Sequence, residues 1–286
     1  MNILPQLIIN SIIAGSIYSL VALGFNLIYG TTKFFNLAHG VLAAVGGYTV
    51  FSLSKMWGLP SIPSVIVGVL FAGFVGYLVD RTVFRSLRKK KASGMVFLVA
   101  SLGVMTALQA VIAIIFSSQF QTLSTGTFKV YRMLGGVITQ VQVIILALSI
   151  FIMFALAILL KYTRFGKAVR AISDDEEVSK IVGINTNKII GRVFFIGSAI
   201  AGLSGILVGF DTGIEPGMGL SLLLKGVIAS IIGGIGNVYG GVLGAFLLGF
   251  IENFGIWKIS GEWKDAIAFG VLLTFLLFRP QGIIKK

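Results

Sequence analysis

The chain has 286 residues, of which 56% are hydrophobic and 12% charged, and its formal net charge at pH 7 is +13. Soluble domains usually contain about 25% charged residues, so this composition excludes a water-soluble enzyme and indicates a helical protein that crosses a membrane several times. The sequence has no cysteine, one histidine and no P-loop motif, which excludes disulfides, multi-histidine metal sites and an ATP site of that kind.

Eight apolar runs are predicted to cross a hydrocarbon core, for which a span of roughly 17–25 residues is typical. A further run over 222–235 has only 14 residues, contains Lys225 and ends at Gly233-Gly234, which favours a short or re-entrant helix. The chain is therefore predicted to be an all-α polytopic transmembrane bundle of eight or nine spans. In chain order, the eight long runs cover 7–29, 35–54, 64–84, 95–116, 141–160, 192–210, 237–255 and 265–279.

The basic residues predict the orientation of this bundle. Most of the 23 Lys and Arg residues lie in one set of loops, concentrated at 81–91, 161–192 and 279–286. The positive-inside rule places these loops in the cytoplasm, with the N-terminus outside and the C-terminus inside, and this arrangement favours nine spans over eight. Because basic residues at span ends face anionic lipid, membrane lipid rather than nucleic acid is the expected partner of the positive charge.

The longest predicted cytoplasmic segment covers 163–190 and contains a short amphipathic helix over 174–182. Ser173 and Glu176 form a capping-box pattern at its start, and Gly183 follows it as a C-cap. Its first turn is acidic, whereas helices that rest on membrane surfaces favour basic residues, so docking to a soluble partner is favoured over a surface helix. The predicted docking residues are Ser173, Glu176, Glu177, Val178, Ile181, Val182 and Gly183.

Four polar residues are candidates either for a transport pathway or for fixing helices against one another. Asn36 and His39 share a face near the start of a span, where a hydrogen-bonded staple is favoured over a pathway role. For Gln109, at the middle of its span, both roles are equally supported. For Glu252, a salt-bridged cap is favoured over a gate.

Two further acidic residues, Asp211 and Glu215, lie in a predicted outer loop and are candidates for docking an extracytoplasmic partner. Small residues also recur at four-residue spacing within spans, which indicates helix faces that pack closely in lipid. The rows are Gly68-Ala72-Gly76, Ser198-Gly202, Ala201-Gly205-Gly209 and Gly236-Gly240-Gly244.

Several motifs, taken together, resemble one family. Residues 177–183 are similar to the Glu-Ala-Ala, three residues, Gly core through which ABC-importer permeases contact their ATPase subunits. From about residue 10 to 283 the chain resembles the LivH-type branched-chain amino-acid permeases, although Val41 stands where many relatives have an acidic residue and 50–160 matches mainly in hydropathy. The other motifs are Gly15–Leu20, Tyr29-Gly30, Asn36–Gly40, Gly46–Tyr48, Pro216–Gly219, Gly233–Asn237, Gly240-Gly241 and Arg279–Gly282.

The resemblance implies a single transmembrane permease domain over 1–286 that imports branched-chain amino acids by alternating access, binds no cofactor and performs no chemistry itself. It also implies a second, LivM-like permease, two ABC ATPase subunits that bind the ATP, and an extracytoplasmic solute-binding protein, all at the cell membrane. Two alternatives stay open: a permease for urea or short-chain amides, and an ion-coupled secondary transporter or channel. The last class normally places ionisable residues inside spans, whereas these spans are nearly free of charge.

Overall fold

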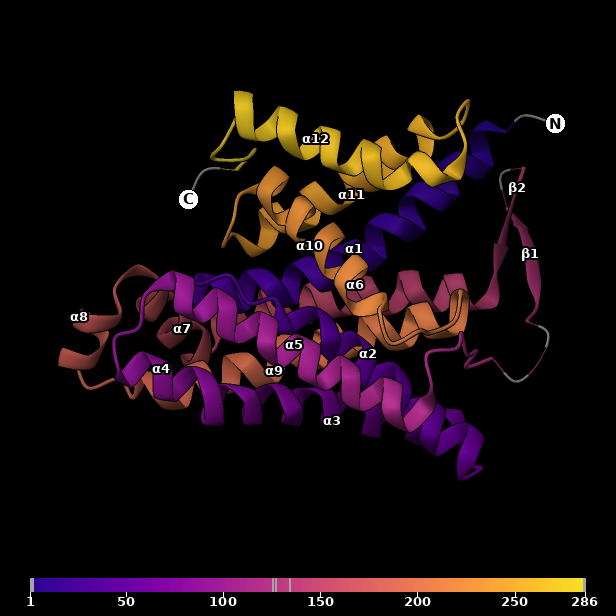
Figure 1. Ribbon diagram of the computed structural model, residues 1–286. Coiled ribbons are helices and arrows are strands. Elements are labelled where there is room, and N and C mark those ends of the chain that lie inside the picture. Colours follow the sequence, from indigo (N-terminus) through magenta and orange to yellow (C-terminus); the bar gives the residue numbers. More distant parts are fainter. Residues whose placement is uncertain (1–2, 125, 127, 134, 285–286) are drawn as a thin grey trace.

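The computed structural model describes residues 3–124, 126, 128–133 and 135–284, which are almost entirely helical (Figure 1). One antiparallel hairpin pairs β1 (Val130–Met133) with β2 (Gly136–Thr139). Short π-helical segments extend α2 over Ser52–Met56 and α3 over Asp80–Phe84. The α-helices are α1 (Leu4–Thr32), α2 (Ala38–Phe51), α3 (Ser61–Val79), α4 (Arg85–Lys89), α5 (Gly94–Phe116), α6 (Gln140–Tyr162), α7 (Arg164–Asp174), α8 (Glu176–Ile181), α9 (Thr186–Asp211), α10 (Met218–Gly233), α11 (Val238–Gly255) and α12 (Lys264–Phe278).

Each predicted span coincides with a helix of the described structure, and six helices are long and apolar enough to cross a membrane. The short run over 222–235 forms α10, whose 16 residues give a length of about 24 Å, which is less than the roughly 30 Å of a hydrocarbon core. The all-α polytopic fold predicted from composition is confirmed. The number of spans and the direction of the termini stay predictions.

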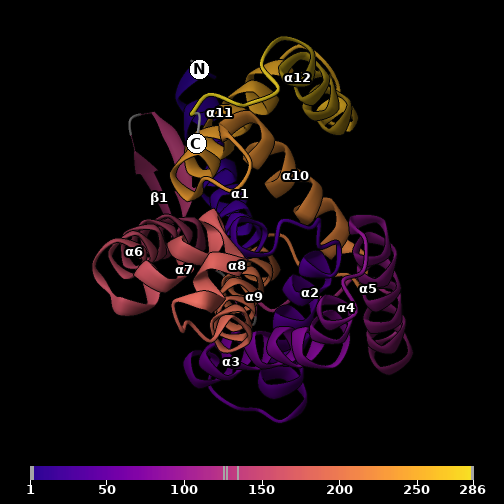
Figure 2. The ribbon, with the colours of Figure 1, turned by 90° about the vertical axis from the view of Figure 1, so that its left-hand side faces the viewer.

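Helix α1 lies at the centre of the molecule, in contact with α6, α9, α10 and α11 (Figure 2). Its apolar residues are spread around the whole helix and most are buried, as expected for a helix enclosed on all sides. By contrast, α5 and α6 bury few side chains and expose large apolar ones, such as Ile114 and Phe151, which are 83% and 65% exposed. Surfaces of this kind suit lipid tails rather than water.

The small-residue rows are packing faces, as the sequence predicts. A methyl group at Gly205 of α9 would overlap the backbone of Ala43 in α2, and one at Gly202 would overlap Ala72 in α3. On the other side of the molecule, Gly233 of α10 and Gly240 of α11 approach each other backbone to backbone. These contacts give the close helix approach that takes the place of a hydrophobic driving force in lipid.

The two ends of the bundle carry different elements (Figure 1). Helices α4, α7 and α8 lie at one end together with the last described residues, whereas the β1–β2 hairpin and the start of α1 lie at the other. The basic residues of α4 therefore share an end with the loop over 163–190, as the predicted orientation requires. We call these two ends the predicted cytoplasmic end and the predicted outer end.

The last described residues close the end of α10. The backbone N–H groups of Ile283 and Ile284 donate to the carbonyl oxygens of Ile232 and Gly233, at 2.8 and 3.1 Å. These carbonyls lie in the last turn of α10, where a helix leaves acceptors without internal donors. The chain segment that follows α12 is thus hydrogen-bonded to the C-terminal end of the short helix α10.

Candidate functional site

The predicted docking loop folds as two helices rather than one. Helix α7 begins at a cap in which the Thr163 hydroxyl accepts a hydrogen bond from the backbone N–H of Gly166 at 3.0 Å. Its polar and apolar residues are strongly segregated, and the apolar side, which includes Val169 and Ile172, is buried against α1, α6 and α9. This half of the loop is therefore anchored to the transmembrane helices.

The prediction of a helix over 174–182 capped by Ser173 is wrong. Ser173 lies within the last turn of α7, because the buried face of that helix continues through Ile172. The chain breaks at Asp175, which is extended at φ −152° and ψ 114°. Its carboxylate accepts hydrogen bonds from the backbone N–H groups of Glu177 and Val178 at 2.8 and 3.0 Å and so caps the next helix. An aspartate fills this position as well as the expected serine would.

Helix α8 presents an apolar surface that nothing in the described chain covers. Val178, Ile181 and Val182 are 53%, 83% and 69% exposed, and α8 lies at the extreme of the predicted cytoplasmic end (Figure 1). Glu176 and Lys180 form an i,i+4 ion pair at 2.7 Å on the helix surface. Gly183 follows at φ +85°, a left-handed conformation that explains why glycine ends this helix.

A cluster of charges, partly buried, joins four helices of the bundle, α1, α10, α11 and α12. The ammonium group of Lys225 in α10 lies 2.6 Å from a carboxylate oxygen of Glu252 in α11 and 2.7 Å from Asp265 at the start of α12. The Tyr18 hydroxyl of α1 donates to the second Glu252 oxygen at 2.7 Å, and Lys264 lies 3.8 Å from that oxygen. Glu252 is completely buried, so its charge is stabilised only because these partners surround it.

This cluster corrects the view that the spans are nearly free of charge. Glu252 does form a salt bridge, but inside a four-helix junction rather than at a helix cap. Its partners Tyr18, Lys225 and Asp265 are absent from the predicted site residues. The signal was available in Lys225, because a lone cation in an apolar run must find an acidic partner on a neighbouring helix.

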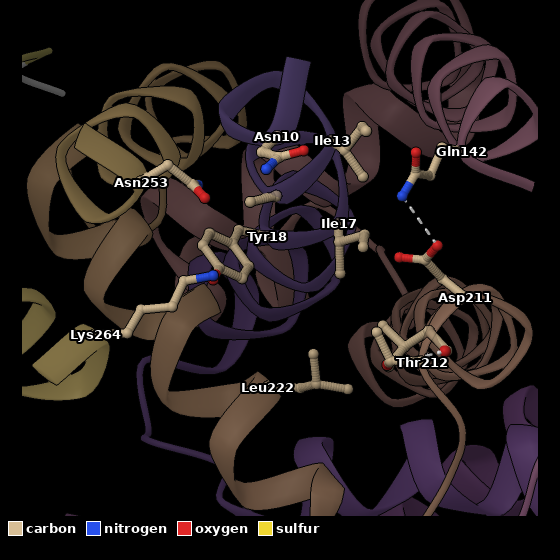
Figure 3. Close-up of a pocket in the computed structure, with 12 residues that line it drawn as sticks. Asn10, Ile13, Ile17, Tyr18, Gln142, Asp211, Thr212, Leu222, Asn253 and Lys264 are labelled. Carbon is tan, nitrogen blue, oxygen red and sulfur yellow. Dashed lines mark hydrogen bonds between the residues drawn. The ribbon is translucent and has the colours of Figure 1, made fainter. Parts of the chain in front are cut away.

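Beside the cluster lies a cavity of about 310 Å³ at the predicted outer end. Figure 3 shows Tyr18, Asn253 and Lys264 on one side and Asp211 with Gln142 on the other, while Ile13, Ile17 and Leu222 lie between them. The amide of Gln142 donates to an Asp211 oxygen at 3.3 Å. The cavity therefore combines charged and polar walls with an aliphatic surface. Its lining is completed by Asn10, Ala14, Val208 and Thr212.

Asn36 and His39 lie where the chain turns from α1 into α2. The side-chain oxygen of Asn36 accepts a hydrogen bond from the backbone N–H of Ala38 at 3.1 Å, at the start of α2. His39 is completely buried and packs against Gly24 and Phe25 of α1. Because Gly24 precedes the end of α1 by two turns, α2 begins within the bundle rather than at its surface.

The remaining predicted residues do not form one site. Gln109 of α5 is half-buried and faces Gly217, just before α10. Asp211 lines the cavity, whereas Glu215 is exposed and lies outside it. The structure thus brings Asp211 close to the surroundings of Glu252, and it separates both from the docking loop at the opposite end.

The fold and these sites define a polytopic helical membrane protein. Residues 7–276 match the family described as branched-chain amino acid transport system / permease component, and the chain belongs to this family. It is 34% identical to the high-affinity branched-chain amino acid transport system permease protein BraD of Pseudomonas aeruginosa, with 98% of this chain and 95% of that protein covered.

One further comparison supports the family and another supports the fold. The permease protein LivH of Escherichia coli, from a system of the same description, is 30% identical over 98% of this chain and 95% of its own length. The fold is similar to a solved structure of PsaBC from Streptococcus pneumoniae in complex with Fab, with a TM-score of 0.52, 14% identity and coverage of 98% and 93%. The protein is therefore a multi-pass permease of the cell membrane and a component of an ABC transport system.

Proposed function

We propose that this chain is the permease subunit of an ABC importer that carries branched-chain amino acids into the cell. The observation that supports this function best is the uncovered apolar surface of α8, defined by Val178, Ile181 and Val182, at the predicted cytoplasmic end. An exposed apolar patch beside charged residues is typical of a protein interface. The partner that this position requires is an ATPase subunit, because the chain has no P-loop of its own.

The helices around α8 provide a route from ATP hydrolysis to the membrane. Helix α8 follows α7 across the single extended residue Asp175, and α7 is packed against α1, α6 and α9. A displacement of α8 by the closing ATPases would therefore move α7 as a unit and shift the helices on which it rests. In this mechanism the chain contributes two arrangements of its helices that differ in free energy, and the ATPases determine which is occupied.

The cavity at the predicted outer end suits an aliphatic amino acid. Ile13, Ile17 and Leu222 offer an aliphatic surface, while Asp211 and Lys264 carry opposite charges on facing walls (Figure 3). A zwitterion with a branched side chain has the same combination of groups. The aliphatic surface favours this substrate over urea, which has no apolar part to bury.

The other components of the system complete the proposal. A second, LivM-like permease would enclose the pathway with this chain, two ATPase subunits would bind ATP, and an extracytoplasmic solute-binding protein would deliver the substrate to the predicted outer end. Asp211 and Glu215 stay candidates for docking that binding protein. Asn36, His39 and Gln109 stay candidates for fixing the helices or lining the pathway.

One observation supports the alternative function, an ion-coupled transporter. It is the buried pair of Lys225 and Glu252, since buried ionisable residues mark ion pathways in membranes. Uptake into proteoliposomes that contain the complete system separates the two functions. We expect leucine uptake that requires ATP and the binding protein, and that excess urea does not inhibit. Uptake that follows an ion gradient without ATP would contradict the importer, and inhibition by urea would shift the substrate assignment.

A further inference from the structure

A strongly basic cavity lies at the predicted cytoplasmic end, between the end of α3 and the start of α9. Its volume is about 420 Å³. Among the described residues that line it, four are cationic and one, Asp80, is acidic. Asp80 is already engaged, because one of its oxygens lies 2.7 Å from the Arg88 guanidinium. The lining consists of Tyr77, Asp80, Arg81, Arg85, Asn185, Asn187, Lys188 and Arg192.

One residue of the cavity lining carries a hydrogen-bond donor that has no partner among the described residues. The Nε atom of Arg85 is buried and has no hydrogen-bond partner among the described residues. Buried donors on charged groups are almost always paired in proteins, because an unpaired one loses its hydration without compensation. The guanidinium of Arg85, which lines the cavity, is therefore not fully hydrogen-bonded within the described chain, and its positive charge favours an anion in the cavity.

An apolar groove adjoins the basic cavity. The groove has a volume of about 590 Å³ and shares two residues with the cavity, Tyr77 and Arg192. Tyr77 packs closely on Gly191 of α9, so it lies at the boundary between the two spaces. In Figure 2, α9 lies between α3 and α6, and all three helices contribute residues to the groove, together with the start of α7. The rest of the lining is Phe74, Leu159, Thr163, Phe165, Phe195 and Ile196.

We propose that the cavity and the groove together bind one anionic phospholipid. The phosphate and headgroup would lie among Arg81, Arg85, Lys188 and Arg192, and one acyl chain would follow the groove towards Phe74. Guanidinium groups match phosphate oxygens in a bidentate manner, and basic pockets between helices on the cytoplasmic side suit anionic lipid headgroups. The continuous apolar groove selects a lipid over a free phosphate ion, which would leave it empty.

The four cations of the site come from two elements, and the proposed transport mechanism moves these elements relative to each other. Arg81 and Arg85 follow α3, whereas Lys188 and Arg192 lie in the first turns of α9, the next helix after α8. A bound lipid would neutralise cations that otherwise repel one another across this junction. The site rests on the helix bundle alone and does not depend on which solute the transporter carries.

The test uses the full-length chain, purified in detergent and stripped of lipid. Binding of dioleoyl phosphatidylglycerol, dioleoyl phosphatidylcholine and inorganic phosphate is measured by native mass spectrometry and by the shift in thermal stability. We expect phosphatidylglycerol to bind on the order of tenfold more tightly than phosphatidylcholine, and phosphate not to displace it.

Two charge-matched variants locate the site. In Arg81→Gln/Arg192→Gln, both altered side chains line the cavity and are exposed, so the fold is expected to survive while the preference for phosphatidylglycerol is lost. Lys89→Gln/Lys90→Gln removes the same charge from exposed positions at the same end but outside the cavity, and should retain the preference.

Four results would overturn the proposal. The two lipids could bind equally, or both double variants could lose the preference equally, which would indicate only a diffuse surface charge. Displacement of phosphatidylglycerol by inorganic phosphate would indicate a simple anion site. Release of the lipid when ATPase subunits bind would assign the cavity to a protein interface.

Discussion

The predicted docking loop and the buried charge cluster are two polar regions of this molecule that are stabilised in opposite ways. In α8 the charged residues lie on the surface and the apolar side chains Val178, Ile181 and Val182 are exposed. In the cluster, the charges of Lys225 and Glu252 are buried and paired. The first arrangement is incomplete without a partner, whereas the second joins helices of the same chain. The difference separates residues that we propose to transmit force from residues that pair with one another inside the bundle.

The largest effect is expected from Glu252→Gln. The substitution leaves the buried Lys225 with only the largely exposed Asp265 as a charged partner, and we expect a loss of about 3 kcal/mol in the free energy of unfolding. Denaturant unfolding in detergent measures this loss. Lys264→Gln is the matched control, because Lys264 lies 3.8 Å from Glu252 and should cost less than about 1 kcal/mol. Equal costs for the two variants would show that the cluster does not hold the helices.

The contrast between packed and lipid-facing glycines gives the second prediction. Gly205→Ala places a methyl group against the Ala43 backbone and should destabilise the protein by about 1–3 kcal/mol. Gly103→Ala is the control, since a methyl group there meets nothing within 4 Å and alanine is the better helix former. Thermal unfolding in detergent should separate the two, and a neutral Gly205→Ala would contradict the close packing of α2 on α9.

A smaller and more local effect is expected at the break between α7 and α8. Asp175→Ala removes the cap of α8 and should destabilise that helix by about 1 kcal/mol, without a change in the unfolding of the bundle. Amide hydrogen exchange of residues 177–182 measures it. Ser173→Ala is the control and should leave this exchange unchanged. Faster exchange of these residues in the Ser173 variant, but not in the Asp175 variant, would show that Ser173 caps α8, as the sequence alone predicts.

The fold could be predicted from the sequence because lipid imposes a simple rule on it. Each long apolar run became a helix, and the glycine rows became contacts between α2, α3 and α9. In the segment over 163–190 a short helix was predicted one break too early, because Ser173 and Asp175 are both good capping residues, and the structure begins that helix after Asp175. Only the burial of Ile172 in α7 decides between them.

The charge cluster could be predicted only in part. The sequence predicts a salt bridge for Glu252 but not its partners. These come from α1, α10 and α12, and the most distant of them in sequence is Tyr18. One sequence contains no information on which helices become neighbours. For the same reason the cavity between Asp211 and Lys264 could not be anticipated, since its walls come from six different helices.

The most direct test of the account is whether α8 binds the ATPase subunits of the transporter. Co-purification in mild detergent would compare Ile181→Lys with Val137→Lys, a matched change at an exposed apolar residue of β2 at the predicted outer end. We predict that wild type and Val137→Lys retain the ATPase, and that Ile181→Lys loses it while its bundle unfolds at an unchanged temperature. Retention of the ATPase by Ile181→Lys would contradict the docking role of α8 and, with it, the proposed route from ATP hydrolysis to the transmembrane helices.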